Sequence, residues 1–239
     1  TQQCNLRCAY CPYSGLYPNH RRHNQSFMDF ETAKKAIDFY LARTRDADRL
    51  AVSFYGGEPL LAFDLIRRCV EYVRGIVEGR ELSFNTTTNG TLVKGEIAEF
   101  LVENNFNLSI SLDGSRSEHD VNRKFANGQG SFDVVMENVR NFTKTYPDYK
   151  ENVSFATTIN PRMDLACTME FFTTDQIMED HHIIFNSINE VGLPDSWQFD
   201  EKATCLRRYE HMKLLCMLAG KLDEKYVSRL VIASREQYQ

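Results

Sequence analysis

Strand-like and helix-like segments alternate along this chain of 239 residues, and this alternation constrains its fold more than any other feature. Short apolar runs predict strands at residues 50–55, 82–88, 106–111, 153–159 and 182–188. Apolar residues at helical spacing predict helices at residues 27–43, 60–77, 94–104, 131–145, 165–178 and 202–220. Strands that alternate with helices favour right-handed βαβ units. The sequence therefore predicts an α/β fold with a parallel sheet.

Polar turns directly follow three of the predicted strands. Gly56-Gly57-Glu58-Pro59 follows residues 50–55, Asn89-Gly90 follows residues 82–88, and Asp113-Gly114 follows residues 106–111. Such sequences cannot continue a regular element. In parallel α/β folds the functional site lies at the carboxyl ends of the strands. We therefore expect the site of this protein to be built from these turns.

The cysteines are unevenly distributed. Three of the seven, Cys4, Cys8 and Cys11, lie within the first eleven residues, whereas the others are scattered. Disulfide frameworks belong mainly to small secreted domains with spread, paired cysteines. The crowded triplet instead favours a metal site in a reducing, cytoplasmic compartment. Cys69 falls on the apolar face of a predicted helix, which favours a core position.

The spacing of the triplet, C-x3-C-x2-C, is compatible with more than one metal. Three thiolates can bind three irons of a [4Fe–4S] cluster and leave the fourth iron open to a substrate or cofactor. The same residues could form part of a structural zinc site with a distant Cys or His. Electron-carrying ferredoxins use four cysteines for each cluster. The rest of the chain must therefore decide among these sites.

Charge and hydropathy exclude some classes of partner. The net charge is −5, which gives no reason to expect a nucleic acid as partner. No run of about 18 apolar residues is present, so no membrane span is expected. No secretory signal peptide opens the chain, which agrees with a cytoplasmic location.

Four motifs in order resemble those of the radical S-adenosylmethionine (SAM) enzymes. The first is C-x3-C-x-aromatic-C, with Tyr10 as the aromatic residue, and the next are Gly-Gly-Glu at 56–58 and Thr-Asn-Gly at 88–90. Ser-Leu-Asp-Gly at 111–114 with His-Asp-x-Asn-Arg at 119–123 is similar to a narrower group of peptide and protein maturases. That group includes anaerobic sulfatase-maturating enzymes and thioether-forming peptide enzymes. The resemblance covers approximately residues 1–190.

The resemblance implies roles around the cluster and the methionine part of SAM. Cys4, Cys8 and Cys11 would ligate the [4Fe–4S] cluster. The segment Gly56, Gly57 and Glu58 would hold the amino group, since glycines permit close approach and a carboxylate accepts from an ammonium.

The SAM carboxylate would be held by Ser111 and Arg123, because a guanidinium forks onto a carboxylate and a hydroxyl adds a donor. A surface arginine in a loop is the alternative for Arg123. Thr88 and Asn89 would line the pocket, although a strand-ending turn explains them nearly as well. We interpret Asp113 as a turn former or helix cap, without a role in the chemistry.

Two residues would contact adenine. Tyr10 would reach it through its backbone or ring, and simple packing explains this tyrosine equally well. Ile188, after the last predicted strand, would supply an apolar contact.

The resemblance also implies an architecture. We expect a partial (β/α)6 TIM-type barrel with parallel strands, whose first strand precedes this chain. Residues 1–200 would form the core domain, and 201–239 a helical continuation toward a C-terminal domain absent from this chain. The chain is therefore expected to be part of a longer enzyme.

The activity implied is that of an oxidoreductase that modifies a peptide or protein. It would cleave SAM reductively to a 5′-deoxyadenosyl radical, which abstracts hydrogen from the substrate, with a one-electron reductant such as ferredoxin or flavodoxin as partner. Thioether formation in a ribosomally made peptide is our first choice and formylglycine formation in a sulfatase is the second. The catalytic base is not recognisable. From another class, a non-catalytic zinc or iron–sulfur module would need a fourth protein ligand and would not bind SAM.

Overall fold

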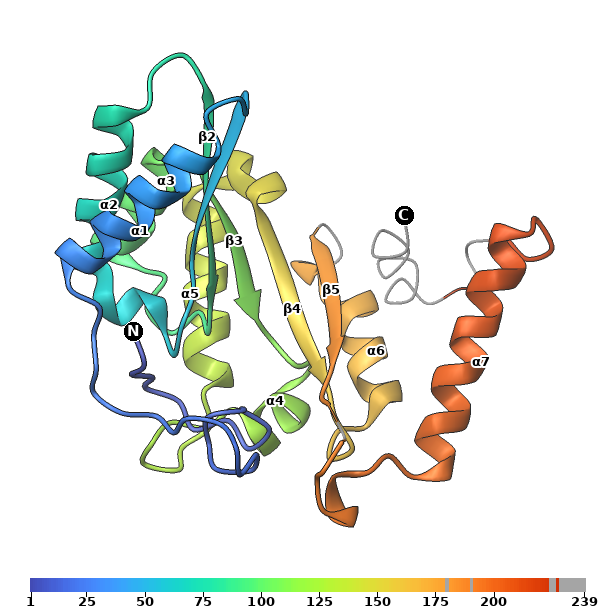
Figure 1. The fold of residues 1–239 in the computed structure, drawn as a ribbon. Helices are drawn as coiled ribbons and strands as arrows, with labels where there is room; N and C mark the ends of the chain where they lie inside the picture. The colour runs from blue at the N-terminus through green and yellow to red at the C-terminus, as the bar shows by residue number, and fades with distance from the viewer. Residues whose placement is uncertain (179–180, 190, 224–226, 228–239) are drawn as a thin grey trace. The chain divides into compact units, whose positions relative to one another are not determined.

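The computed structural model describes residues 1–178, 181–189, 191–223 and 227. Its strands form one sheet in the order β1-β2-β3-β4-β5 (Figure 1). Their bounds are Arg49–Phe54, Glu81–Thr88, Phe106–Ser111, Val153–Ile159 and His182–Ser187. The pairs β1/β2, β2/β3 and β4/β5 are parallel. The predicted α/β class with parallel strands, as in a partial (β/α) barrel, is confirmed.

The longer helices match the predicted ones within a few residues, except that α6 ends earlier. They are α1 Phe30–Arg43, α2 Phe63–Ile76, α3 Gly95–Glu103, α5 Phe132–Thr145, α6 Leu165–Thr174 and α7 Glu201–Leu218. The pattern did not predict helix α4 or the 3₁₀ turns η1, η2 and η4, which are Arg116–Asn122, Pro59–Ala62, Pro147–Asn152 and Asp195–Trp197. These elements are too short for their apolar residues to repeat at helical spacing.

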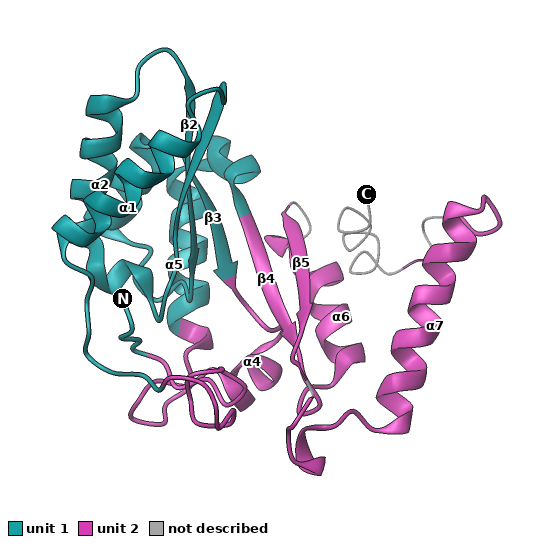
Figure 2. Ribbon diagram, in the orientation of Figure 1, with its two compact units in different colours: residues 1–5, 22–110, 134–153 teal, residues 6–21, 111–133, 154–239 magenta. Residues whose placement is uncertain are grey.

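The chain divides into two compact units (Figure 2). Unit 1 comprises residues 1–5, 22–110 and 134–153, and unit 2 comprises residues 6–21, 111–133 and 154–239. Each unit contains part of the site predicted from the sequence.

Unit 1 is built from β1, β2 and most of β3 with α1, α2, α3 and most of α5. The rings of Phe84 and Phe106, on neighbouring strands, stack with centroids 5.4 Å apart. Helix α2 buries Ile66, Cys69 and Val70. The predicted core position of Cys69 is therefore confirmed, with 2% of the residue exposed.

Unit 2 contains α4, most of β4, α6, β5 and α7. Phe155 of β4 and Phe172 of α6 are fully buried. At the end of β3, the Leu112 N–H donates to the carbonyl of Ala156 in β4 (2.9 Å), so the residues after Ile110 continue the pairing inside this unit. This hydrogen bond fixes the start of the Asp113 turn, which follows β3, against β4.

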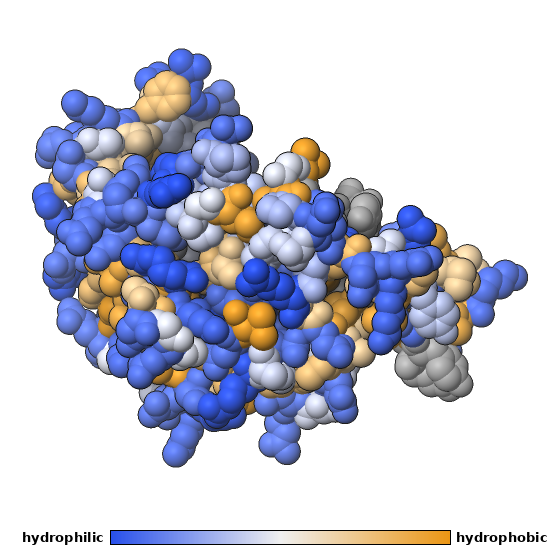
Figure 3. All heavy atoms as spheres, turned by 90° about the horizontal axis from the view of Figure 1, so that it is seen from below, coloured by the Kyte–Doolittle hydropathy of each residue, from blue (hydrophilic) through white to orange (hydrophobic). Residues whose placement is uncertain are grey.

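Helix α7 begins the predicted continuation of the chain at residue 201. Residues 224–226 and 228–239 of that continuation lie outside the described residues. None of the helices in the described ranges has the length and apolar composition that crossing a bilayer requires. On the face shown in Figure 3, hydrophilic residues predominate and hydrophobic ones are interspersed among them.

Candidate functional site

In unit 1, Glu58 is buried and receives three hydrogen bonds. One carboxylate oxygen, Oε1, accepts from the Thr88 hydroxyl (2.7 Å) and from the Leu60 N–H (3.1 Å), and Oε2 accepts from the Asn89 N–H (2.7 Å). Burial raises the pKa of the Glu58 carboxyl, although these donors oppose the shift. Glu58 therefore joins the turn after β1 to the turn after β2, two turns that the sequence marks only separately.

Gly56 and Gly57 lie directly against the main chain that precedes the first cysteine. A Cβ atom on Gly56 would stand 2.3 Å from the Thr1 carbonyl oxygen, and one on Gly57 would stand 2.1 Å from that of Gln3. The Gly57 N–H donates to Thr1 (2.9 Å) and the Glu58 N–H to Gln3 (2.8 Å). Residues 1–3, rather than a ligand, thus make the close approach to these two glycines that the sequence led us to expect. A contact between the glycines and a ligand stays a prediction.

The turn after β2 contacts the segment of Cys4 through Asn89. The side-chain amide of Asn89 lies 3.9 Å from the Cys4 sulfur and donates to Asn5 (2.8 Å). Its oxygen accepts from both the N–H and the hydroxyl of Thr91. Thr88 and Asn89 are therefore engaged in holding Glu58 and the Cys4 segment, and their predicted role as pocket lining stays a prediction.

In unit 2, the segment that carries Cys8 lies antiparallel to residues 122–125. The Arg7 N–H donates to the carbonyl of Lys124 (2.7 Å), and the Ala9 N–H donates to that of Asn122 (3.0 Å). Cys8 and Cys11 are each partly exposed. Burial, opposed by a main-chain hydrogen bond and by nearby arginines, raises the pKa of the Cys11 thiol. The sequence places the two thiols close along the chain, but only the structure shows that residues 122–125 run alongside them.

Asp113 joins Tyr10 to Arg123. Its Oδ2 accepts from the Tyr10 hydroxyl (2.6 Å) and lies 2.9 Å from Nε of Arg123, while Oδ1 accepts from the Thr158 N–H (3.0 Å). Asp113 is fully buried, and Arg123 is 7% exposed, so Arg123 is no surface arginine. Ser115, not Asp113, occupies the N-cap position of helix α4, so the helix-cap interpretation of Asp113 is wrong. No local sequence pattern pointed to these partners, because Tyr10 and Asp113 are 103 residues apart.

The charge of Arg123 is stabilised in this network. Burial lowers the pKa of the guanidinium, but Asp113, Tyr10 and Cys8 raise it above its ordinary value. The guanidinium carbon also lies 5.4 Å from the centroid of the Tyr10 ring. Ser111, the other residue predicted to bind a carboxylate, is half-buried at the end of β3. Unit 2 thus contains both predicted carboxylate ligands.

The motif histidine, His119, has a structural place in the same network. Its Nδ1 accepts from the Asp113 N–H (3.4 Å), so its Nε2 is assigned as the donor to the Ser131 hydroxyl (2.9 Å). That hydroxyl donates to the carbonyl of Arg123 (2.8 Å). Burial lowers the pKa of His119 to about 3. His119 therefore stays neutral and holds the main chain at Arg123.

Both predicted adenine contacts belong to one hydrophobic cluster. Tyr10 and Ile188 pack together with Leu193 and Trp197, which lie beyond β5. Neither Leu193 nor Trp197 was predicted from the sequence, because no motif marks them. This arrangement supports the packing interpretation of Tyr10, and contact with adenine stays a prediction for both Tyr10 and Ile188.

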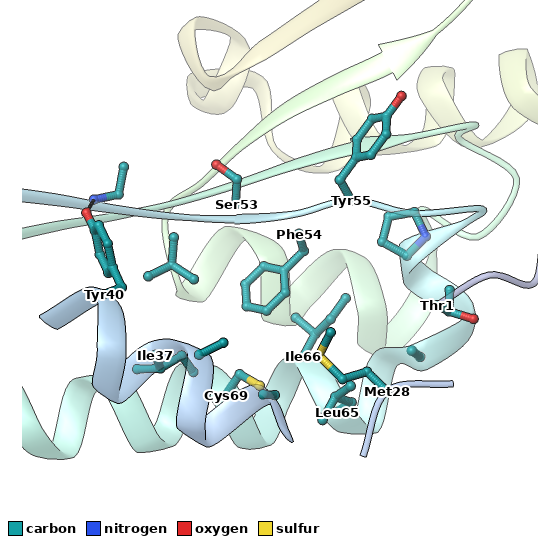
Figure 4. A pocket seen from close by; sticks show the side chains of 16 residues that line it. Thr1, Met28, Ile37, Tyr40, Ser53, Phe54, Tyr55, Leu65, Ile66 and Cys69 are labelled. Carbon is teal, nitrogen blue, oxygen red and sulfur yellow. Dashed lines mark hydrogen bonds between the residues drawn. The ribbon is translucent and has the colours of Figure 1, made fainter. Parts of the chain in front are cut away.

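A separate apolar pocket of about 330 Å³ lies in unit 1 between α1, β1 and α2 (Figure 4). No charged side chain lines it. It includes none of the predicted site residues, and it therefore lacks the groups that the predicted chemistry requires.

In the part of the chain that the structure describes, no three His, Cys, Asp or Glu side chains gather as ligands of one metal ion. This finding concerns a single ion such as zinc, whereas each thiolate of a [4Fe–4S] cluster binds a different iron.

Comparison with known proteins identifies relatives. The family model of the radical SAM superfamily matches residues 1–164. Uncharacterized protein MJ0907 of Methanocaldococcus jannaschii is 37% identical over 131 residues, which are 55% of this chain and 42% of that protein. The cysteine-type anaerobic sulfatase-maturating enzyme of Clostridium novyi is 30% identical over 162 residues, which are 67% of this chain and 42% of the enzyme. The chain thus spans 42% of the length of both curated relatives.

A solved structure, native anSMEcpe with bound AdoMet, resembles this one with a TM-score of 0.72 at 23% sequence identity. The match covers 93% of this chain and 61% of the other. It shows that the two chains share a fold.

Proposed function

Because this chain belongs to the radical SAM superfamily, we propose that it cleaves SAM reductively and abstracts hydrogen from a peptide or protein. The family implies a [4Fe–4S] cluster and SAM as cofactors. When bound, the reduced cluster and SAM together supply the 5′-deoxyadenosyl radical that takes the hydrogen. The single observation that carries the proposal beyond the family match is the network that places a buried, charged Arg123 beside Tyr10, which precedes Cys11.

The cysteine segment fits a cluster in its chemistry. Cys4, Cys8 and Cys11 are partly exposed, so their thiolates can reach irons that lie outside the packed interior. Main-chain hydrogen bonds hold the residues on either side of Cys8, which limits the motion of that ligand. Three such ligands leave one iron of a cubane without a protein ligand, which is where SAM would bind.

Arg123 and Ser111 would hold the carboxylate of SAM. A buried guanidinium keeps its charge here because Asp113 pairs with it, and guanidinium groups bind carboxylates with two parallel hydrogen bonds. Tyr10 and Ile188, which pack in one hydrophobic cluster, would supply the apolar contacts to the adenine ring. Glu58 already accepts three hydrogen bonds from the protein, so a contact with the SAM amino group would add to this arrangement.

The substrate class is proposed from the relatives. The relative from Clostridium novyi is a sulfatase-maturating enzyme, and a second solved structure with this fold holds native anSMEcpe with AdoMet and the Kp18Cys peptide. These relatives support a peptide or protein substrate. Formylglycine formation in a sulfatase and thioether formation in a peptide are two candidates with equal support. A one-electron reductant such as ferredoxin or flavodoxin would reduce the cluster.

The first experiment tests SAM cleavage. The full chain is loaded with iron and sulfide without oxygen, reduced, and assayed for 5′-deoxyadenosine. Cys8→Ala is expected to lose the cluster and the product, whereas Cys205→Ala, on the exposed side of α7, keeps both. A well-formed cluster that binds no SAM, with a fourth protein ligand, would instead establish the non-catalytic module.

The second experiment separates the two substrates. The active chain is incubated with a sulfatase peptide that carries a Cys or Ser, and separately with a Cys-rich peptide. An aldehyde in the first peptide identifies formylglycine formation, and loss of two hydrogen atoms with a new sulfur–carbon bond in the second identifies thioether formation. Neither product from an enzyme that cleaves SAM would remove both candidates.

A further inference from the structure

The cysteine segment, here residues 8–11, and Arg123 both contact one carboxylate oxygen of Asp113. Tyr10 lies between Cys8 and Cys11, and its hydroxyl donates to Oδ2 of Asp113 at 2.6 Å. Nε of Arg123 lies 2.9 Å from the same oxygen. One atom of Asp113 therefore fixes the positions of two groups that come from different parts of the chain.

Burial limits how far these three side chains can move. Asp113 is 0% exposed, while Tyr10 and Arg123 are each 7% exposed. A carboxylate in such a place must be fully partnered, because water cannot replace a lost donor. Asp113 meets this need with the Tyr10 hydroxyl, the Arg123 guanidinium and the Thr158 N–H. Neither Tyr10 nor Arg123 can move away without leaving the carboxylate short of a partner.

We propose that Asp113 is a positioning residue that sets the cysteine segment, through Tyr10, at a fixed place relative to Arg123. A carboxylate ligand bound by Arg123 would then lie at a fixed distance from Cys8 and Cys11. This inference rests on the proposed function, because it assigns Arg123 to SAM and the cysteines to the cluster.

A simpler role for Asp113 would be to neutralise the charge of Arg123. That role does not need the Tyr10 hydroxyl, so Tyr10→Phe distinguishes the two roles. The substitution removes one hydroxyl and leaves the ring, with its cation–π contact to Arg123, and the Asp113–Arg123 pair in place. Tyr17→Phe is the matched control, since Tyr17 packs against the same hydrophobic cluster but donates to the carbonyl of Asn189 (2.9 Å).

The first measurement uses the full chain without iron. The rates at which iodoacetamide alkylates Cys8 and Cys11 are followed by mass spectrometry of the digested protein. Tyr10→Phe is expected to raise both rates severalfold above those of Tyr17→Phe, because the cysteine segment loses its attachment to Asp113. Equal rates in the two variants would overturn the proposal.

The second measurement uses the chain loaded with its cluster. Tyr10→Phe is expected to weaken SAM binding about tenfold, which corresponds to the loss of one hydrogen bond to a charged group. The electron paramagnetic resonance spectrum of the reduced cluster with SAM should also change shape, which a purely stabilising role for Tyr10 would not cause. Wild-type affinity together with a wild-type spectrum would contradict the proposal.

Asp113→Asn completes the test through a double-mutant cycle with Tyr10→Phe. If both residues act through one contact, the double variant binds SAM no more weakly than Asp113→Asn alone. Additive losses would show independent roles and overturn the proposal. If wild type itself cleaves no SAM, the proposed function fails, whereas the alkylation rates of the iron-free chain still decide whether Asp113 positions the cysteine segment.

Discussion

At the scale of single residues, Arg123 shows how a charge can be kept in a buried position. Its guanidinium is 7% exposed, which would be costly for an isolated cation. Asp113 and the ring of Tyr10 offset that cost. The carbonyl of Arg123 is in turn held by Ser131, so both the side chain and the main chain of this residue are fixed.

Arg123→Lys is expected to weaken SAM binding by about tenfold or more. Lysine keeps the positive charge beside Asp113 but lacks the planar fork that matches a carboxylate. Calorimetric titration of SAM into the cluster-loaded chain measures the change. The control is Arg116→Lys, because Arg116 is exposed and pairs with Asp133 in the same unit. An unchanged affinity in Arg123→Lys would refute the carboxylate assignment.

His119 predicts a dependence of stability on pH. Its pKa is about 3 in the folded chain, below its ordinary value of 6.5, so between these values only the unfolded chain binds the proton. The free energy of unfolding should therefore fall by about 1.4 kcal/mol per pH unit as the pH drops below 6.5 and approaches 3. At higher pH the histidine is neutral in both states, and its contribution is fully present.

Urea unfolding of the iron-free chain at about pH 7 and about pH 5 measures this slope. His119→Gln should be less stable at the higher pH and lose less stability on acidification, because the titrating group is gone. Parallel slopes in wild type and His119→Gln would show that His119 does not cause the effect.

At the scale of elements, the turns after the strands do more than end them. The turn after β1 donates two hydrogen bonds to the main chain of residues 1–3, and the turn after β2 donates to Glu58. These contacts attach residues 1–3, which precede the predicted ligand Cys4, and the predicted ligand Glu58 to the ends of β1 and β2. The glycines are required because the approaching group is a backbone, which cannot move aside as a flexible side chain can.

Gly57→Ala should destabilise the chain by about 1–3 kcal/mol, as expected when a packed site is overfilled. The added Cβ would stand 2.1 Å from the Gln3 carbonyl oxygen, so the segment before Cys4 must shift. Gly75→Ala is the control in the same unit, since Gly75 lies in helix α2 and a Cβ added there would meet nothing within 4 Å. That variant should gain about 0.5–1 kcal/mol.

Denaturant midpoints of the two iron-free variants give the comparison. If Gly57→Ala is as stable as Gly75→Ala, residues 1–3 can leave the turn at little cost in free energy. The assignment of Gly57 to this close approach would then be wrong.

At the scale of the whole molecule, the cofactors should stabilise the fold that binds them. Because SAM would bind the open iron, SAM should raise the melting temperature of the cluster-loaded chain but hardly change that of the iron-free chain. A ligand at about a hundred times its dissociation constant contributes about 2.7 kcal/mol. Scanning calorimetry without oxygen measures both forms, and an equal shift in the two would place SAM away from the cluster.

The fold could be predicted from the sequence because its signals are local. The strands β1 to β5 carry short apolar runs and the longer helices a periodic apolar pattern, and the predicted strands match within a residue or two. The cysteine spacing and the order of the motifs likewise identified the family, which the family model confirms over residues 1–164. Short elements such as α4 carry too few residues for a period to appear.

The partners of the motif residues could not be predicted, because they depend on contacts between distant parts of the chain. The sequence alone determined the strands, the longer helices, the cysteine triplet and the candidate ligands. Only the tertiary structure decided that Asp113 binds Tyr10 and Arg123, and that Glu58 joins two turns. The physical reason is that burial removes water as a partner, so a polar group takes whichever donor the packed chain brings to it, however far away in sequence that donor lies.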